Sequence, residues 1–213
     1  MEKLRTAVFV SGGGTNLQAI IDAVKSGVIK HAEIALVISS NPGAYAINRA
    51  EAAGIPVRVI AKKSCADREE FENKLQKELK RYKIDLIVLA GFMILLSGSF
   101  TSSYPGRIIN VHPSLIPAFS GKGYYGLRVH EAALKYGVKV TGATVHFVNE
   151  TPDGGEIIAQ KAVKVRDCDT PETLQRRVME NAEWALLPKA VETVSKSLLK
   201  QIRAGKTTKG EKS

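Results

Sequence analysis

The stretch Thr6-Ala-Val-Phe-Val-Ser11 runs directly into Gly12-Gly13-Gly14-Thr15-Asn16 near the start of the chain. Its first part is a continuous apolar run, which is typical of a β-strand buried on both faces. The glycines allow backbone N–H groups to approach a ligand closely, and residues 16–24 have the apolar spacing of a helix. A strand, a glycine turn and a helix in this order form a unit whose turn suits an anion such as a phosphate, because the helix N-terminus adds its positive dipole.

Two other glycine motifs fit this turn less well. The dinucleotide-binding fingerprint requires a third glycine where the chain has Leu17, and a Walker loop requires a following Gly-Lys-Ser or Gly-Lys-Thr. The remaining alternative is a tight turn without a ligand, in which Thr15 or Asn16 caps the helix. We therefore expect an anion at this turn, with the plain turn as the alternative.

Apolar runs and helical patterns alternate along the rest of the chain. We expect strands at residues 6–11, 33–39, 56–60, 86–90, 108–111, 141–148 and 156–165. We expect helices at residues 16–24, 44–53, 68–82, 129–136 and 171–200. Asp67 is a suitable N-cap for the third helix, and Pro188 predicts a kink or break in the last one. Strands that alternate with helices predict an α/β fold with right-handed crossovers and a mostly parallel sheet.

The composition fits one large domain. The chain has 213 residues, of which 44% are hydrophobic, and it has no apolar run near the ~18–20 residues that a membrane span needs. The N-terminus shows no signal-peptide cleavage pattern. Cys65 and Cys168 have neither metal-site spacing nor the pattern of a disulfide framework. We expect a reducing, cytoplasmic location, no metal and no membrane.

The formal net charge is +10, and residues 200–213 contribute +4 of it. A terminus rich in Lys, Gly and Thr is typical of a disordered, solvated segment. We therefore expect one domain over residues 1–200 and a basic, disordered tail over residues 201–213. Charge without interleaved aromatic residues indicates nucleic acid only weakly, and we do not expect nucleic acid as a partner. The positive charge suits an anionic small-molecule substrate.

The stretch Asn110-Val-His-Pro-Ser-Leu115 follows a short apolar run that reads as the end of a strand. Side chains two residues apart in a strand point to the same side, so Asn110 and His112 are expected side by side at the strand's carboxyl end. Pro113 then ends the ladder. An amide can donate to a developing oxyanion, and an imidazole can donate, accept or carry charge near neutral pH. The alternative is a turn whose histidine only bonds backbone carbonyls.

Asp153 lies in Thr151-Pro-Asp-Gly-Gly155, between two apolar runs. Asp-Gly is common in hairpin turns, so a structural role is one interpretation. The functional one directs Asp153 at His112, 41 residues earlier. A carboxylate beside an imidazole raises the pKa of the imidazole and fixes its orientation.

Two further loops follow expected strands. Residues 90–97 leave a strand's carboxyl end as an apolar run, which suits either a flat ligand slot or the start of a core helix. Residues 117–126 are rich in glycine, with aromatic residues and Lys122, and read as a lid. His130 and His146 are expected to have structural roles.

Five stretches, taken together, resemble the glycinamide ribonucleotide formyltransferase family, also called phosphoribosylglycinamide formyltransferases. They are residues 11–18, 88–93, 110–115, 140–146 and 153–155, and they occur in the family's order over nearly the whole chain before the tail. The resemblance implies transfer of a formyl group from 10-formyltetrahydrofolate to the amine of glycinamide ribonucleotide in purine synthesis. It also implies a Rossmann-like, mixed seven-stranded sheet with helices on both faces.

The resemblance also assigns roles to residues of this chain. Gly14, Thr15 and Asn16 would bind the substrate phosphate, and Glu183 would contact the ribose. Asn110, His112 and Asp153 would be the catalytic residues. The remaining assignments are folate contacts, by Arg68, Asn110 and the backbone of Met93, Ile94, Leu95 and Leu96.

Two residues depart from the family pattern. Ile94 stands where many members carry Arg or Lys, so a folate contact there must come from the main chain. Ser120 replaces a frequent Pro in the lid. The sequence gives no oligomeric state, and a monomer and a homodimer both remain open.

Other functions predict other features. The formyltransferase that acts on initiator Met-tRNA adds a C-terminal barrel, and a formyltetrahydrofolate hydrolase usually carries an N-terminal regulatory domain; we expect neither here. A nucleotide- or RNA-binding domain without catalysis would not need Asn110, His112 and Asp153 together. A dehydrogenase is disfavoured by the missing third glycine.

Overall fold

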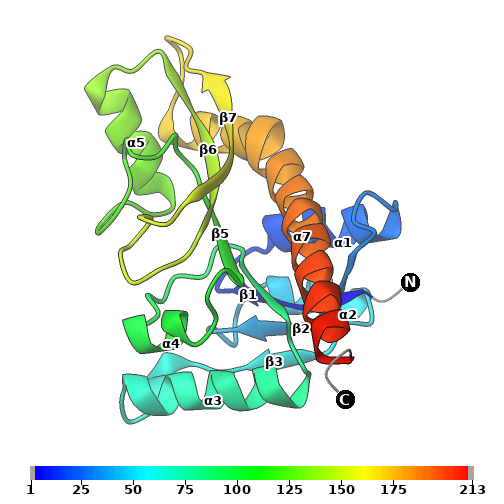
Figure 1. The fold of residues 1–213 in the computed structure, drawn as a ribbon. Helices are drawn as coiled ribbons and strands as arrows, with labels where there is room; N and C mark the ends of the chain where they lie inside the picture. The colour runs from blue at the N-terminus through cyan, green and yellow to red at the C-terminus, as the bar shows by residue number, and fades with distance from the viewer. Residues whose placement is uncertain (1–2, 211–213) are drawn as a thin grey trace.

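A seven-stranded sheet organises the computed structural model, which describes the backbone of residues 3–210 and the side chains of residues 3–204 (Figure 1). The strands are β1 (Leu4–Val10), β2 (Ala32–Ser39), β3 (Val57–Val59), β4 (Leu86–Leu89), β5 (Ile108–His112), β6 (Val140–Phe147) and β7 (Ile157–Lys164). Their order in the sheet is β3-β2-β1-β4-β5-β6-β7. Strands β1 to β5 pair in parallel, while β6 is antiparallel to both β5 and β7. The expected α/β fold with a mostly parallel, mixed sheet is confirmed.

Helices cover both faces of the sheet. They are α1 (Thr15–Lys25), α2 (Ala46–Ala52), α3 (Arg68–Arg81), α4 (Gly98–Ser102), α5 (Leu127–Tyr136), α6 (Pro171–Val178) and α7 (Trp184–Gly210), with a 3₁₀ turn η1 (Lys62–Ser64) and a π-helical turn η2 (Met179–Glu183). Buried side chains of α1, α2, α6 and α7 share one hydrophobic core with the sheet. Those of α3 and α4 share a second core on the opposite face. The central strands β1 and β4 are apolar on both sides because each face is covered there.

Local sequence explains where these helices begin. Asp67 caps α3 by accepting a hydrogen bond from the Glu70 N–H, as expected. Thr170 and Thr173 form a reciprocal cap at α6, with Pro171 at its first position. The short helix α4 and the turn η1 were not predicted, because segments of three to five residues carry little periodicity.

The closing helical segment differs from its prediction. The sequence predicts a kink or break at Pro188; the break is wrong, because Pro188 lies inside α7, and an irregular turn, η2, lies upstream of it. A π turn adds one residue to the helix and so changes which side chains face the sheet. Here it buries Glu183, which is 6% exposed.

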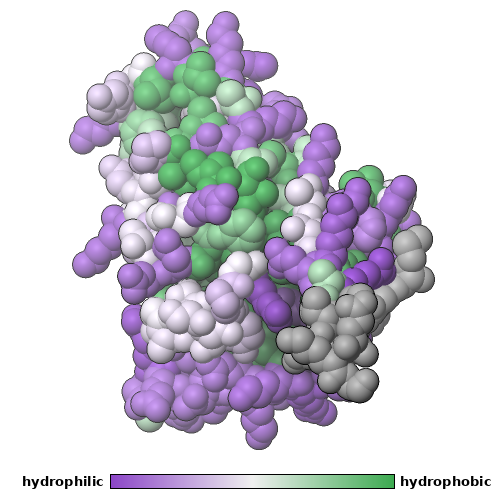
Figure 2. Space-filling view, in the orientation of Figure 1, coloured by the Kyte–Doolittle hydropathy of each residue, from purple (hydrophilic) through white to green (hydrophobic). Residues whose placement is uncertain are grey.

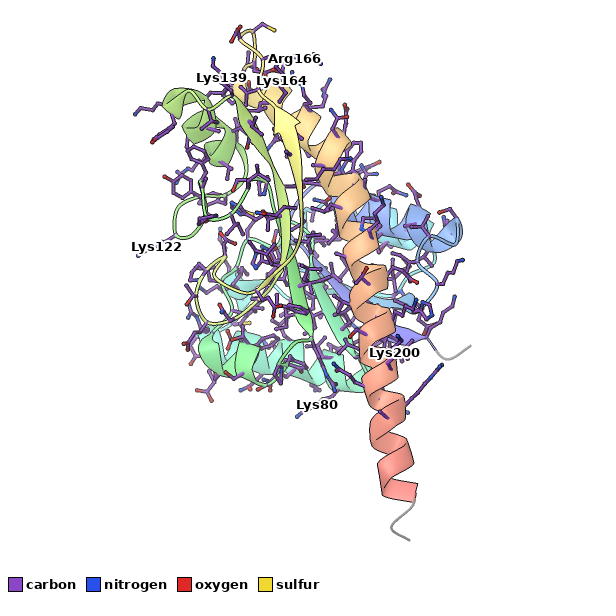
Figure 3. All side chains as sticks on the ribbon, turned by 45° about the horizontal axis from the view of Figure 1, so that its top comes forward. Lys80, Lys122, Lys139, Lys164, Arg166 and Lys200 are labelled. Atoms are coloured by element: carbon purple, nitrogen blue, oxygen red, sulfur yellow. The ribbon has the colours of Figure 1, made fainter. Side chains whose placement is uncertain are left out.

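The C-terminal end of α7 projects from the rest of the molecule (Figure 3). The backbone of residues 201–210 continues this helix, whereas the sequence predicts that a tail begins at residue 201. Residues 211–213 lie outside the described residues. The division into a domain and a tail therefore stays a prediction.

The surface is unevenly polar. Hydrophilic side chains cover α3 at the bottom of the space-filling view, while apolar side chains lie over β6 and β7, where Val140 and Ile157 are exposed (Figure 2). Within residues 3–210, no helix is both long enough and apolar enough to cross a membrane.

Candidate active site

Three loops meet where the parallel strands β1, β4 and β5 end. These strands are neighbours in the sheet, so their carboxyl ends lie at the same edge, which is where open α/β sheets bind ligands. The loop after β1 and the loop after β4 are in contact, because the Met93 N–H donates to Ser11 Oγ over 2.9 Å. The structure therefore brings together the glycine turn, the apolar run after residue 90 and the Asn110–His112 pair.

Asn110 is held by a histidine on the adjacent strand. In the antiparallel pairing of β5 and β6, Asn110 lies opposite His146, and its Nδ2 is 3.2 Å from His146 Nε2. His146 Nδ1 is 2.8 Å from the carbonyl oxygen of Phe147, which can only accept. In the neutral imidazole, Nδ1 therefore carries the hydrogen, and Nε2 accepts from the Asn110 amide. This contact fixes which side of the Asn110 side chain can donate to a ligand.

His112 is almost fully buried, with 4% of the residue exposed. Its Nε2 donates to the carbonyl oxygen of Phe119 over 2.8 Å, and its Nδ1 lies 3.5 Å from Asp153 Oδ2. Burial lowers the pKa of His112, and the opposing effects of Asp153 and the Phe119 carbonyl do not cancel it. The expectation that the carboxylate raises the pKa is correct for that pair and wrong for the net direction. His112 is therefore neutral at pH 7 in the unliganded protein.

Asp153 reaches the site from the loop between β6 and β7. Its φ of 54° is left-handed, a conformation that Asp adopts more readily than most residues. The loop packs closely on β6, since a Cβ on Gly155 would lie 1.8 Å from the carbonyl oxygen of Phe147. Because β6 ends at Phe147 and β7 begins at Ile157, residues 148–156 form a loop that is longer than a two-residue hairpin. This loop carries the Asp153 carboxylate into the site.

The Asp153 carboxylate has three neighbours in the site. Oδ2 accepts from the Gly121 N–H over 2.8 Å, and Oδ1 lies 3.6 Å from His146 Nε2. Burial would raise the pKa of Asp153, but His146, the charge of His112 and the Gly121 N–H together lower the pKa below its ordinary value of 3.8. Asp153 is therefore ionised at neutral pH. Two residues of the predicted lid contact this pair: the Phe119 carbonyl accepts from His112, and the Gly121 N–H donates to Asp153.

The glycine turn presents unpaired backbone donors. Gly14 is the N-cap of α1 with φ 74°, and no side chain caps the helix, so the alternative with Thr15 or Asn16 as the cap is wrong. A Cβ on Gly14 would lie 2.6 Å from the Cβ of Ala46. Among residues 3–204, the N–H groups of residues 12–17 have no hydrogen-bond acceptor. Arg49 Nε donates to the Gly13 carbonyl over 2.8 Å and adds a positive charge beside the turn.

Asn16 and Glu183 form a buried pair between α1 and η2. The Asn16 Nδ2 donates to Glu183 Oε2 over 2.6 Å, while the Asn16 Oδ1 is buried without a partner among the described residues. Burial raises the pKa of Glu183, and the bond from Asn16 opposes this effect. Two residues separated by 167 positions are thus joined beside the glycine turn.

Several of the predicted folate residues have exposed side chains. Residues 91–97 form no core helix, and Met93 and Leu95 are 53% and 56% exposed. Arg68, the first residue of α3, is also exposed. Lys122 lies on the lid loop and points away from the body (Figure 3). Ser120 Oγ donates to the Pro117 carbonyl within the same loop. In the part of the chain that the structure describes, no group of three or more His, Cys, Asp or Glu residues could hold a metal.

Sequence reasoning missed His146. It alternates with Thr144 in β6 like any inward-facing residue, and only the pairing register places it opposite Asn110. The sequence predicts a structural role for His146, and His146 does hold another side chain in place. That side chain is Asn110, so His146 lies within the candidate site. The lid contributions also went unpredicted, because the Phe119 carbonyl and Gly121 N–H are backbone groups.

His130 is fully buried in α5, and neither ring nitrogen has a hydrogen-bond partner among the described residues. Burial, with a smaller effect from the charge of His112, lowers the pKa of His130 to about 4. An unfolded chain binds a proton near pH 6.5, so its proton uptake below that pH destabilises the folded state. We expect about 2 kcal/mol of stability to be lost between pH 7 and pH 5 through this residue.

Thermal unfolding measured across pH 5–7 tests this expectation. His130→Leu should reduce the loss of stability toward pH 5, whereas Tyr136→Phe, on the same helix with an exposed side chain, should retain it. An equally steep pH dependence in His130→Leu and the wild type would contradict the assignment.

Comparison with known sequences identifies the family. The profile of the family described as formyl transferase matches residues 4–191. The chain belongs to the formyl transferase family. This formyl transferase places its Asn110, His112 and Asp153 within the matched region, together with the glycine turn.

Its relatives include free-standing and multifunctional proteins. It is 40% identical to the phosphoribosylglycinamide formyltransferase of Haemophilus influenzae, over 92% of this chain and 89% of that protein. It is 45% identical to the trifunctional purine biosynthetic protein adenosine-3 of Gallus gallus, over 96% of this chain. The chain spans only 20% of the length of the chicken protein.

Solved structures share the fold of this formyl transferase. The glycinamide ribonucleotide transformylase 1 of Symbiobacterium toebii superimposes with a TM-score of 0.85 at 40% identity, covering 92% of this chain and 89% of the other. The phosphoribosylglycinamide formyltransferase of Bacillus halodurans gives a TM-score of 0.82 at 41% identity, covering 89% and 94%.

Proposed function

We propose that this formyl transferase is a phosphoribosylglycinamide formyltransferase. It transfers the formyl group of 10-formyltetrahydrofolate to the amine of N1-(5-phospho-β-D-ribosyl)glycinamide, giving the N-formyl product and tetrahydrofolate in de novo purine (IMP) biosynthesis. The observation that carries the proposal is the meeting of Asn110, His112 and Asp153 at the strand edge that also holds the anion-binding turn. Its named relatives support the same acceptor and the transfer of a formyl group.

The acceptor binds on the side of β1. The unpaired N–H groups of residues 12–17 and the nearby Arg49 bind the phosphate, because both favour an anion. Gly14 allows the close approach, and Thr15 and Asn16 supply N–H groups of the first helical turn. Glu183, already bonded to Asn16, accepts hydrogen bonds from the ribose hydroxyls.

The formyl donor binds on the side of β4. The backbone of Met93 to Leu96 contacts its flat ring, and Arg68, an exposed cation at the start of α3, pairs with the acidic end of the folate. Asn110, between the two halves, contacts the formyl group. Ile94 has no charged group, so its contribution comes from the main chain.

The chemistry follows from the charges of the three residues. The neutral amine attacks the formyl carbon, a C–N bond forms, and the carbonyl oxygen gains the negative charge of a tetrahedral intermediate. The Asn110 amide donates to this oxygen, and one such donor is typically worth ~3–4 kcal/mol. In the neutral ring of His112 the one N–H already donates to the Phe119 carbonyl, so His112 donates to the oxyanion when it takes up a proton as the negative charge develops. Asp153, ionised at neutral pH, accepts the amine proton directly or through water. The bond from carbon to N10 of the folate then breaks, and the proton passes to N10.

The remaining features are parts of the same proposal. The substrates are small molecules, and the positive net charge of the chain suits an anionic one. A cytoplasmic location is part of this proposal, and Cys65 and Cys168 form no disulfide bond within the described residues. Whether the protein acts as a monomer or a homodimer stays a prediction.

A folate-product assay tests the function. The purified protein is mixed with 10-formyltetrahydrofolate, with and without glycinamide ribonucleotide, and the deformylated folate is followed optically. We expect product only when the ribonucleotide is present. Product without the ribonucleotide would indicate a hydrolase. Absence of product in both mixtures, beside an active relative as control, would overturn the proposal in favour of another acceptor or a non-catalytic binding domain.

A further inference from the structure

Residues 91–97, here called the strap, connect the end of β4 to the start of α4. Their side chains alternate: Phe92, Ile94 and Leu96 pack on the core beneath, while Met93 and Leu95 are more than half exposed. Phe92 also makes an edge contact with Phe9, with the ring centroids 5.2 Å apart. The strap is therefore an extended segment with one apolar face on the protein and one face toward solvent.

Ser11 holds the beginning of the strap. Its Oγ accepts from the Met93 N–H over 2.9 Å and shares a hydrogen bond with Ser40 Oγ over 2.6 Å. Because Ser11 directly precedes Gly12, it is also the first residue of the anion-binding turn. One hydroxyl thus connects the strap, the turn and the end of β2.

Glu72 holds the end of the strap. This carboxylate from α3 is only 7% exposed, and it accepts from both the N–H and the Oγ–H of Ser97. Ser97 in turn caps α4 through its bond from the Phe100 N–H. A buried carboxylate is costly unless its bonds are satisfied, so this contact restrains both α3 and the strap.

The middle of the strap has no such partners. Among residues 3–204, the N–H and carbonyl groups of residues 94–96 bond to no other residue. The strap is therefore fastened near both ends and leaves a short run of backbone donors and acceptors open between them. A segment held in its binding conformation binds a ligand more tightly, because less conformational entropy is lost on binding.

We propose that Glu72 and Ser11 are positioning residues that hold the strap in the extended form that binds the formyl-folate. The inference rests on the proposed function, since that function places the folate at the strap. The two residues differ in how many segments of the candidate site they contact. Glu72 contacts the strap alone, whereas Ser11 also belongs to the turn that binds the ribonucleotide phosphate.

Direct binding distinguishes the two anchors. The affinities for a 5,8-dideaza analogue of 10-formylfolate and for glycinamide ribonucleotide are measured separately by calorimetry. Glu72→Ala should raise the Kd for the analogue at least tenfold and change the Kd for the ribonucleotide less than twofold. Ser11→Ala should raise the Kd for the analogue at least fivefold and should also raise the Kd for the ribonucleotide.

Kinetics and matched variants separate positioning from general damage. With saturating substrates, Glu72→Ala should keep kcat within threefold of the wild type, so that the defect lies in KM for the folate. Glu72→Gln, which keeps an acceptor for the Ser97 N–H, should restore analogue binding to within threefold. Glu69→Ala, at an exposed position of the same helix, should behave as the wild type.

An analogue Kd within twofold of the wild type in folded Glu72→Ala would overturn the proposal. If that variant does not fold, Ser11→Ala decides by the same criterion. The outcome is separate from that of the proposed function, because binding is measured without turnover. A wild-type protein that binds the analogue but transfers no formyl group would overturn the function and leave the strap assignment intact.

Discussion

Replacement of His112 by Ala is expected to lower turnover about a thousandfold, while the Kd of each substrate changes less than threefold. The imidazole is expected to act on charge that develops only in the transition state, and removing one donor of this kind typically costs 10²–10³ in kcat. Its burial and its contacts with Phe119 and Asp153 hold the ring in place before the substrate arrives. Single-turnover formyl transfer, measured with saturating substrates, gives this loss directly.

His31→Ala is the matched control for this experiment. His31 is a partly exposed histidine just before β2, and its Nδ1 pairs with Glu192 of α7. Neither residue belongs to the loops that form the candidate site. Its turnover should equal that of the wild type. If the turnover of His112→Ala lies within tenfold of the wild-type value, His112 is not a catalytic residue and the mechanism fails.

Asp153→Asn is expected to lower turnover by roughly 10³–10⁴, the upper range for loss of a proton-transfer group. Asparagine keeps the size of the side chain, and its oxygen can still accept from the Gly121 N–H, so the loop should stay in place. The variant removes the negative charge that faces His112 and His146. Asp167→Asn, which changes an almost fully exposed carboxylate, is the control.

The pH dependence of this variant has a definite sign. The folded pKa of Asp153 is lowered, so its ionised form contributes stability above the unfolded pKa near 3.8, and this is lost as pH falls through the folded pKa. Wild-type activity should therefore show no loss from Asp153 protonation above about pH 5, more than one unit above that ordinary pKa. Since Asp153 raises the pKa of His112 against burial, Asp153→Asn should lower that pKa further, as NMR titration of the ring would detect. An unchanged His112 pKa, or turnover within tenfold of the wild type, would contradict the assigned pair.

Much of the site could be predicted because its logic is local. Asn110 and His112 lie two residues apart in a strand, so period-two alternation alone places both side chains on one side. Gly14 precedes a helix with strong apolar spacing, and its left-handed conformation follows from the need for a tight βα turn. The family resemblance selected the functional interpretation of Asp153 and of the strap, and it added Glu183 and Arg68, which no spacing rule would have connected.

Other parts depended on packing between distant segments. Strand pairing places His146 against Asn110, and the loop after β5 folds back so that Phe119 and Gly121 contact His112 and Asp153. Pro188 predicted an irregularity, but the π turn formed upstream, where it buries Glu183 against Asn16. No local pattern encodes these contacts, since each joins groups from separate elements.

The sequence by itself determined the α/β class, the strand that carries Asn110 and His112, and the glycine turn, because periodicity and backbone freedom are properties of neighbouring residues. The tertiary structure alone decided the net direction of the His112 pKa, the role of His146 and the fastening of the strap by Glu72. Desolvation depends on everything packed around a group, and pairing register depends on the whole sheet. These quantities exist only once the chain has folded.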